Sequence, residues 1–516
     1  MTYLSLPVRA ILLFAFFLVS SSSAYAQPVT FASSMDPIEV AGSDYGNTAI
    51  RMVLNASDEP VVSFGKSSHL YVAKWNSETQ AFDPPVVIEP TQAIYLSDQE
   101  GPEMVAHGDL IVLTYSHNGD WVSGLRSVRS DDGGVSWSDP VEVSPQTTTE
   151  LFLPCVAMDD DGNPFVGVIA GGVGEDKYEA AIQSLDGGQS WLSPVNSSEL
   201  MDGDQVCECC PSSPFFTQGR YYNVIRNNNS NTRDFWLVGS PDGQSWNSAL
   251  DVDPIDWVVS SCPASGATVA GPMSDGSHWL AFMNQDPVSS SSRVFLTQVD
   301  LQANDGAGEW LYTGNVSPDP SEAGIQNAPV MDVRNLGDGS PLAALVWEEN
   351  VGGYDVQLSL ALNDGSLLGA APMNLTSAFS GHHKKPIVRL GSATAAVPYE
   401  IDVHLVWKDA QMGVVRYLKG VASGPDGIAS ENTDRPIRPS IAAVGAGGFT
   451  AVLPLAWRAG VWKIWDVTGK LLDSGSLNGD AQWNWRADAP RTARVIIVGI
   501  EPSEGVPGWA QKVALH

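Results

Sequence analysis

The most unusual chemistry in this sequence is a cluster of cysteines. Cys207, Cys209 and Cys210 place three sulfurs within four residues, and the 516-residue chain holds two more cysteines, Cys155 and Cys262. Cys155, Cys210 and Cys262 are each next to a proline at the expected start of a strand. Gathered thiolates suit Cu(I) or Zn(II), and the softness of sulfur favours copper. The five cysteines are therefore candidate ligands for copper or zinc.

Disulfide bonds are the competing interpretation, because they are the default for a secreted chain. Adjacent Cys209 and Cys210 are poor partners for each other, so two disulfides would join separate segments and leave one thiol free. One disulfide beside a reduced cluster, or a reactive redox thiol, are further alternatives. His382 and His383 begin a later strand and are additional candidate ligands. The sequence leaves these alternatives open.

A recurring octapeptide indicates the elements that position these residues. Ser-Asp-Asp-Gly-Gly-Val-Ser-Trp occupies residues 130–137, Ser-Leu-Asp-Gly-Gly-Gln-Ser-Trp residues 184–191, and a shorter version residues 240–246. Each Asp-Gly pair predicts a hairpin turn, because glycine adopts positive φ and aspartate bonds to its own backbone. The tryptophan should pack under the turn. The residues assigned this structural role are Asp132, Trp137, Asp186, Trp191, Asp242 and Trp246.

These octapeptides resemble the Asp box of β-propellers in the sialidase superfamily, and their recurrence at the spacing of one blade makes the resemblance specific. The resemblance implies an all-β propeller with the Asp boxes on its rim. In that family the boxes are structural, so they indicate the fold and leave the function open.

Seven pairs of expected strands favour the same fold. In each unit, an apolar β-rich stretch, a turn and a second β-rich stretch follow one another, at residues 50–64, 102–115, 154–169, 211–225, 263–283, 329–347 and 386–407. Seven blades are favoured, and six are possible if one unit is an insertion. Residues 37–40 should add the outer strand of the last blade, closing the ring and removing exposed sheet edges. The propeller is predicted over residues 37–430.

The sialidase resemblance also implies a catalytic set. Members of that family hold a carboxylate with arginines, and a tyrosine nucleophile with an acidic partner attacks the sugar. On the matching segments, Arg51 and Arg226 take the arginine roles. Tyr354 takes the role of the nucleophile and Glu208 that of the acidic partner.

The match to this catalytic set is incomplete. The family's glutamate would fall on Cys210, two residues after Glu208, and no aspartate occupies a convincing general-acid position. Either Arg334 or Arg389 could be the third arginine of the cluster.

Charge and an N-terminal segment restrict location and partners. The chain has 27 basic and 59 acidic residues, for a net charge of −32, which disfavours nucleic acids and anionic lipids as partners. Residues 1–26 read as a signal peptide, with Arg9, a short apolar run and Ala-Tyr-Ala before Gln27. No later segment is long and apolar enough to span a bilayer. We expect a monomer, secreted or on the cell surface, exported through the periplasm.

The pattern changes after the propeller. Residues 433–516 resemble the small β-sandwich that directs proteins to the type IX secretion system, through Ile-Trp-Asp-Val-Thr-Gly-Lys-Leu at residues 464–471 and Gln-Lys-Val at 511–513. The Asn-Pro start usual in that family is missing. The resemblance implies the secretion machinery as a partner; an eighth blade or an accessory β domain is the alternative.

Two functions follow as hypotheses. The first is a propeller that binds or hydrolyses acidic glycans at its axis, a glycoside hydrolase of sialidase type if it is active. The second is a non-hydrolytic propeller whose cysteines hold copper or zinc or perform redox chemistry.

Overall fold

A computed structural model describes two parts of the chain, a propeller and a C-terminal unit. The predicted signal peptide lies outside the described residues. In the propeller these are residues 29–44, 48–98, 101–122, 124–144, 149–172, 174–201, 205–286, 289–316, 324–362, 372–395 and 399–423. In the C-terminal unit they are 440–444, 448–452, 459–466, 471–478, 482–486, 495–502 and 509–514.

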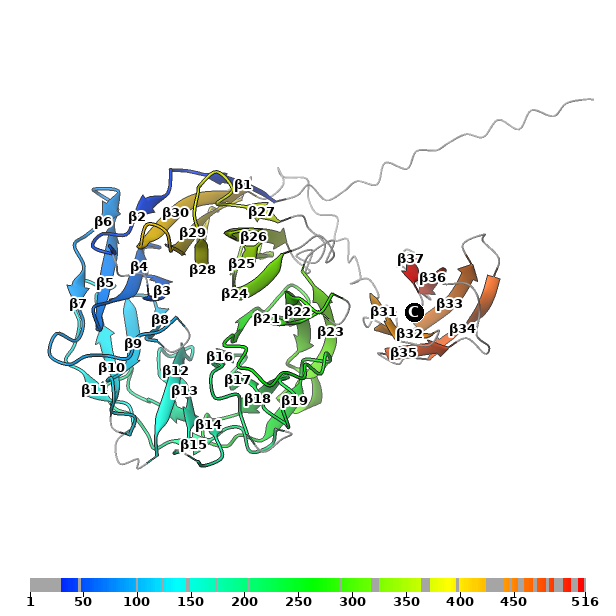
Figure 1. Cartoon of the computed structure of the whole chain (residues 1–516), viewed down its shortest axis with the longest axis horizontal. Coiled ribbons are helices and arrows are strands. Elements are labelled where there is room, and N and C mark those ends of the chain that lie inside the picture. The colour runs from blue at the N-terminus through cyan, green and yellow to red at the C-terminus, as the bar shows by residue number, and fades with distance from the viewer. Residues whose placement is uncertain are drawn as a thin grey trace, which may run out of the picture.

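Seven antiparallel sheets form a closed ring, so seven blades are confirmed and six are not (Figure 1). Each blade begins with an inner strand near the axis and proceeds outward along the chain. Blade 1 contains β3 (Thr48–Leu54), β4 (Pro60–Lys66), β5 (His69–Asn76), β6 (Ala81–Phe82) and β7 (Val86–Val87). Blade 2 contains β8 (Glu103–His107), β9 (Leu110–Ser116), β10 (Leu125–Ser130) and β11 (Val141–Glu142). Blade 3 contains β12 (Leu151–Met158), β13 (Pro164–Ala170), β14 (Tyr178–Gln183) and β15 (Val195–Asn196).

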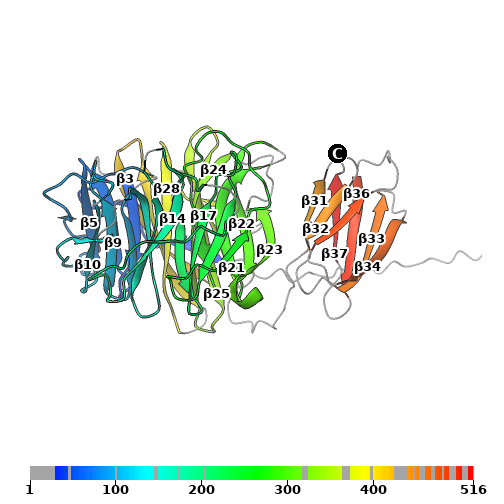
Figure 2. The same ribbon diagram turned by 90° about the horizontal axis from the view of Figure 1, so that it is seen from below.

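The remaining blades repeat this arrangement. Blade 4 contains β16 (Ser213–Thr217), β17 (Arg220–Arg226), β18 (Phe235–Ser240) and β19 (Ser248–Asp251). Blade 5 contains β20 (Ala267–Ala270), β21 (His278–Gln285), β22 (Ser292–Asp300), the short helix η1 (Ala303–Gly306) and β23 (Glu309–Asn315). Blade 6 contains β24 (Ile325–Asn335), β25 (Pro341–Asn350), β26 (Tyr354–Leu362) and β27 (Met373–Asn374). Figure 2 shows the blades edge-on.

Blade 7 joins the two ends of the propeller. It contains β28 (His383–Ala393), β29 (Glu400–Asp409) and β30 (Val414–Ser423), and the N-terminal strands β1 (Thr30–Ser33) and β2 (Ile38–Glu39) pair with β30. In this antiparallel pairing Ile38 lies opposite Tyr417. The predicted closure by residues 37–40 is thus confirmed, and β1 extends it. Pairing the outer edge of β30 in this way protects it from association with other chains.

The Asp boxes form the turns between the third and fourth strands of blades 2, 3 and 4. In the second box, Asp186 Oδ1 accepts hydrogen bonds from the backbone N–H of Gln189 at 3.0 Å and of Ser190 at 2.8 Å. These bonds lower the pKa of Asp186 although burial opposes the shift. Trp191 is buried and its Nε1 donates to Ser127 Oγ at 2.9 Å. Each box therefore fixes its own hairpin and, through its tryptophan, packs on the sheets.

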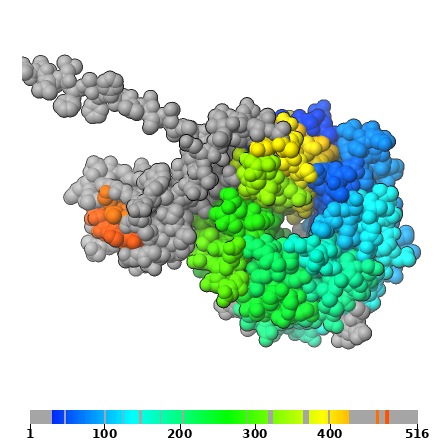
Figure 3. All heavy atoms as spheres, turned by 180° about the vertical axis from the view of Figure 1, so that it is seen from behind, coloured from blue at the N-terminus to red at the C-terminus, as the bar shows by residue number. Residues whose placement is uncertain are grey.

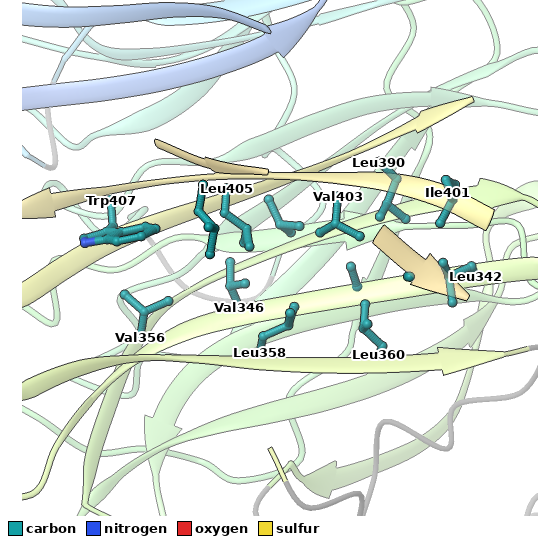
Figure 4. Packing of buried hydrophobic residues seen from close by; sticks show 14 of the residues in the cluster. Leu342, Val346, Val356, Leu358, Leu360, Leu390, Ile401, Val403, Leu405 and Trp407 are labelled. Atoms are coloured by element: carbon teal, nitrogen blue, oxygen red, sulfur yellow. The ribbon is translucent and has the colours of Figure 1, made fainter. Parts of the chain in front are cut away.

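Apolar contacts between neighbouring blades make the core. The largest of these clusters lies between blades 6 and 7 (Figure 4). Side chains of β25 and β26, among them Val346 and Leu358, face Val403, Leu405 and Trp407 of β29. Each blade therefore depends on both neighbours for burial, as expected for sheets too small to bury their faces alone.

The C-terminal unit consists of two small sheets. One joins β31 (Ser440–Val444), β32 (Gly448–Val452) and β35 (Gln482–Arg486), and the other β34 (Leu471–Asn478), β33 (Ala459–Asp466), β36 (Val495–Pro502) and β37 (Trp509–Ala514). The prediction of a small all-β unit here is confirmed, while its sorting role stays a prediction. No helix in the described part of the chain is long and hydrophobic enough to cross a bilayer.

Candidate functional site

A cavity of about 460 Å³ lies on the propeller axis, where the inner strands of all seven blades converge. Figure 3 shows the ring hollowed at its centre. Its charged lining residues are three cationic and three acidic side chains: Arg51, Lys385, Arg389, Asp98, Glu103 and Asp332. Ser212, Ser265 and Cys155 add smaller polar groups. The axis is therefore a polar pocket with both signs of charge.

Irregular backbone positions several of these side chains. The inner strands of blades 1, 3, 6 and 7 each contain a register shift, with Ala49, Leu153, Ala328 and Lys385 at φ between 50° and 53°. These residues carry a Cβ, so the left-handed conformation is strained. A bulge re-aims the residues that follow it. Arg51 and Cys155 each come two residues after such a position and line the cavity.

Arg51 forms an ion pair with Glu103 of the neighbouring blade inside the cavity. Its Nη1 also donates to the Ile50 carbonyl at 2.7 Å. Burial opposes the charge of Arg51, but Glu103, followed by Cys155 and Asp98, raises its pKa above the ordinary value. Arg51 is thus held as a cation on the cavity wall, and its role as a ligand-binding arginine stays a prediction.

Arg389, on β28 of blade 7, is the second arginine of the cavity. Its Nη1 donates to the Val388 carbonyl at 2.8 Å, and it forms no salt bridge with the residues that the structure describes. Burial lowers the pKa of Arg389; Asp332 and Glu103 oppose this, while Arg334 and Arg51 add to it. The charged form of Arg389 is therefore disfavoured mainly by burial.

Arg226 does not share this cavity, so the structure does not bring it together with Arg51. It ends β17 and is 1% exposed, with Nη1 donating to the Arg233 carbonyl at 3.3 Å. Its guanidinium lies 4.1 Å from the centre of the Phe235 ring and 5.4 Å from that of Trp257. β17 is the second strand of its blade, so its last residue packs within the blades and not at the axis.

Tyr354 and Glu208 also lie away from the axial cavity. Tyr354 begins β26, the third strand of blade 6, and Lys384 Nζ lies 3.7 Å from the centre of its ring. Glu208 is exposed and lines a separate pocket with Glu150, Glu175 and Lys177. Among the described residues no tyrosine lines the axial cavity. The tyrosine nucleophile of the sialidase set is therefore not in place.

The five cysteines, candidate ligands of one metal in the sequence, do not lie together in the structure. Cys155 lies on the cavity wall, whereas the sulfurs of Cys207, Cys209 and Cys210 lie within 4.8 Å of one another in a separate group. Cys209 forms a disulfide with Cys262 across 53 residues, and the other three cysteines are free. We call Cys207, Cys209, Cys210 and Cys262 the sulfur cluster. Of the alternatives the sequence left open, one disulfide beside reduced thiols is the one observed.

This arrangement does not fit copper or zinc held by five thiolates. Cys209 and Cys262 are bonded to each other, so Cys207 and Cys210 are the thiols left in the sulfur cluster, fewer than the four ligands of a structural zinc site. His383 is buried, and its Nδ1 accepts a hydrogen bond from Trp407 Nε1 at 3.2 Å. His382 is exposed and packs beside Tyr354.

The two free thiols of the sulfur cluster differ in acidity. A hydrogen bond from Cys210 lowers the pKa of Cys207 to about 6; burial opposes this shift, and the backbone N–H of Cys209 and the charges of Arg233 and Arg226 add to it. Burial raises the pKa of Cys210, and its contact with Cys207 raises it further. Arg226 therefore has an electrostatic role here in place of the one predicted at the axis.

A buried carboxyl lies behind the cavity wall. Glu179 of β14 is 1% exposed, and its Oε1 accepts a hydrogen bond from Asn223 Nδ2 at 3.0 Å. Burial raises the pKa of Glu179 to about 7, against the hydrogen bonds from Ser212 and Asn223. Burial, with the charges of Glu103 and Glu179, raises the pKa of the Cys155 thiol. Burial therefore favours the protonated form of Cys155, unlike that of Cys207.

Sequence reasoning missed Glu103, Asp332 and Lys385 as lining residues. Glu103 directly follows the proline that opens the second strand pair, and Lys385 directly precedes the proline of the last pair. The polar residues next to these recurring prolines were the signal from which the lining residues could have been predicted. Which of them face the axis depends on the strand register and the bulges.

Comparison with known proteins shows similarity in fold. No protein-family model matches the chain, and no curated protein matches it. A protein of unknown function from Dyadobacter fermentans is 14% identical, with 65% of this chain and 99% of that chain covered and a TM-score of 0.43. An ulvan lyase is 12% identical, covering 74% and 96% with a TM-score of 0.45. The NanB sialidase of Streptococcus pneumoniae is 10% identical, covering 77% and 94% with a TM-score of 0.39. The seven-bladed all-β propeller is shown by the sheet topology, and these three chains are similar to it at low identity.

Proposed function

We propose that the axial cavity binds the carboxylate of an acidic sugar, with Arg389 and Arg51 as its ligands. The observation that carries this proposal is that two arginines of adjacent blades line one pocket and one of them forms no described salt bridge. A planar guanidinium matches a carboxylate with two parallel hydrogen bonds.

The electrostatics of the cavity favour an anion. Burial is the largest cause of the lowered pKa of Arg389; Asp332 and Glu103 favour its charge more than Arg334 and Arg51 disfavour it, but they do not cancel the cost of burial. An incoming carboxylate would stabilise this buried cation. The volume of about 460 Å³ is within the range of pockets that hold small ligands.

The proposal is limited to binding, because the described lining contains no tyrosine to act as nucleophile. If the chain also cleaves sialosides, Tyr354→Phe should leave turnover of a fluorogenic sialoside unchanged, since Tyr354 lies on a third strand outside the cavity. Loss of turnover in this variant would restore Tyr354 to the catalytic role that the sialidase resemblance implied.

The test is calorimetric titration of the full chain with 3′-sialyllactose, a glucuronate-containing disaccharide and neutral lactose. At least one acidic sugar should bind in preference to lactose. Arg389→Gln should weaken that binding by roughly 10- to 100-fold, the value of a hydrogen bond to a charged group. Arg126→Gln is the matched control, since Arg126 on a third strand is 21% exposed against 20% for Arg51. Equal affinity for acidic and neutral sugars, or no effect of Arg389→Gln, would refute the proposal.

A further inference from the structure

We propose that Cys207 and Cys210 form a reactive dithiol that exchanges with the Cys209–Cys262 disulfide. The propeller would then hold a thiol–disulfide exchange site in its sulfur cluster, separate from the axial cavity. The proposal is independent of sugar binding.

The geometry brings a free thiol up to a disulfide. Cys207 Sγ lies 3.7 Å from Cys209 Sγ, which is bonded to Cys262. The sulfur of Cys210 belongs to the same group, in which all three sulfurs are within 4.8 Å of one another. Exchange proceeds by attack of a thiolate on a disulfide sulfur, so nucleophile and target already adjoin.

The backbone presents Cys207 and Cys210 as a Cys-x-x-Cys pair. The N–H of Cys210 donates to the Cys207 carbonyl at 3.1 Å, closing a turn, and the N–H of Cys207 donates to the Arg226 carbonyl at 2.8 Å. This spacing, together with nearby arginines, is the setting in which thiols become nucleophilic. Arg226 and Arg233 provide the positive charge beside Cys207.

The exchange balances without an external oxidant. The Cys207 thiolate attacks Cys209 Sγ, the Cys207–Cys209 bond forms, and the Cys209–Cys262 bond breaks with its electron pair leaving on Cys262, which takes a proton from water. Cys210 then loses its proton and attacks Cys207 Sγ, and the Cys207–Cys209 bond breaks. Cys209 takes up a proton. One disulfide opens and one forms, with two thiols consumed and two released.

The exposed position of Cys262 lets a reagent in the solvent take part in the exchange. Cys207 is 1% and Cys210 3% exposed, whereas Cys262 is exposed. An outside reagent therefore reaches the buried pair through Cys262, and the partner class is a small thiol or disulfide. Opening the Cys209–Cys262 bridge would also disconnect two segments in which the residues two positions after each cysteine, Pro211 and Ala264, line the axial cavity.

The test is trapping of the native full chain with excess N-ethylmaleimide, followed by acid quench and disulfide mapping by mass spectrometry. Maleimide should label Cys209 and Cys262 and leave a Cys207–Cys210 disulfide. Cys207→Ser should slow labelling of Cys262 at least ten-fold because the attacking thiol is gone. Cys155→Ser is the matched control, since it removes a buried free thiol outside the cluster and should leave the rate of Cys262 labelling unchanged.

Persistence of an unlabelled Cys209–Cys262 bridge in the unsubstituted chain would overturn the proposal. This mapping needs no substitution, so it decides the matter even if Cys207→Ser fails to fold. Stoichiometric zinc or copper bound to a chain with no bridge in the sulfur cluster would also overturn it, in favour of a metal site. Sugar binding measured on the same preparation reports separately on the axial cavity.

Discussion

Replacing Glu179 by glutamine should make the stability of the propeller less sensitive to pH. Glu179 lies within blade 3, and its carboxylate forms no salt bridge among the described residues. Its interior hydrogen bonds come from neutral groups, and burial raises its pKa to about 7. Glutamine retains an oxygen that can accept the hydrogen bond from Asn223, but it has no charge to bury.

The magnitude follows from the two states of the chain. An unfolded glutamate titrates near pH ~4.3, so between there and pH 7 the folded chain binds a proton that the unfolded chain does not. The free energy of unfolding therefore falls as the pH rises through this interval. At about 1.4 kcal/mol for each pH unit, the total is roughly 4 kcal/mol, of which roughly 3 kcal/mol falls between pH 5 and pH 8. The free energy of unfolding of Glu179→Gln should not fall in this way, because glutamine does not titrate.

The assay is urea unfolding followed by tryptophan fluorescence at pH 5 and pH 8. Relative to the unsubstituted chain, Glu179→Gln should gain roughly 3 kcal/mol between the two pH values. Glu199→Gln, at an exposed position, is the control and should follow the unsubstituted chain. Burial also raises the pKa of other carboxyls, such as that of Asp253 to about 8. These groups are present in both the variant and the unsubstituted chain, so their effect cancels when the two pH dependences are subtracted. Identical pH dependence in Glu179→Gln and the unsubstituted chain would refute the reasoning.

Three further predictions concern stability. Gly167→Ala should lower the free energy of unfolding by about 1–3 kcal/mol in the same urea assay, because a Cβ would lie 2.7 Å from Asn223 Nδ2 and 2.8 Å from Glu179 Oε1; an unchanged midpoint would contradict this. Asp186→Ala should cost about 1–2 kcal/mol through the lost turn bonds and leave sugar binding intact, whereas weaker binding in calorimetry would give the Asp box a role beyond structure. A chain shortened to begin at Gly42 lacks β1 and β2, so it should melt at a lower temperature and aggregate, as measured by calorimetry and light scattering; an unchanged melting temperature would show that closure adds no stability.

Much of the fold was predictable because its signals are local. An Asp-Gly turn followed by tryptophan is specified within eight residues, and each strand pair carries its own turn, so repetition along the chain revealed the blades. The closing strand was recognisable because a ring of sheets needs one. The residues of the candidate site were harder to predict from the sequence. Arg51 and Arg226 were assigned from the sequence and Arg389 was one of two candidates for a third arginine, yet Arg51 and Arg389 line the cavity because their strands are innermost, whereas Arg226 lies on a second strand.

The sequence by itself determined the repeat, the hairpin turns, the strong negative charge and the positions of the sulfurs. Tertiary structure decided which side chains face the axis, because this depends on bulges at Ala49, Leu153, Ala328 and Lys385. Alanine, leucine and lysine seldom adopt positive φ, so the sequence does not indicate a left-handed backbone at these positions. It also decided which cysteine bonds to Cys262. Cys209 and Cys210 are adjacent in the chain, so the choice between them depends on how two segments 53 residues apart approach each other. Such long-range geometry leaves no local pattern in the sequence, and it separates the axial cavity from the sulfur cluster.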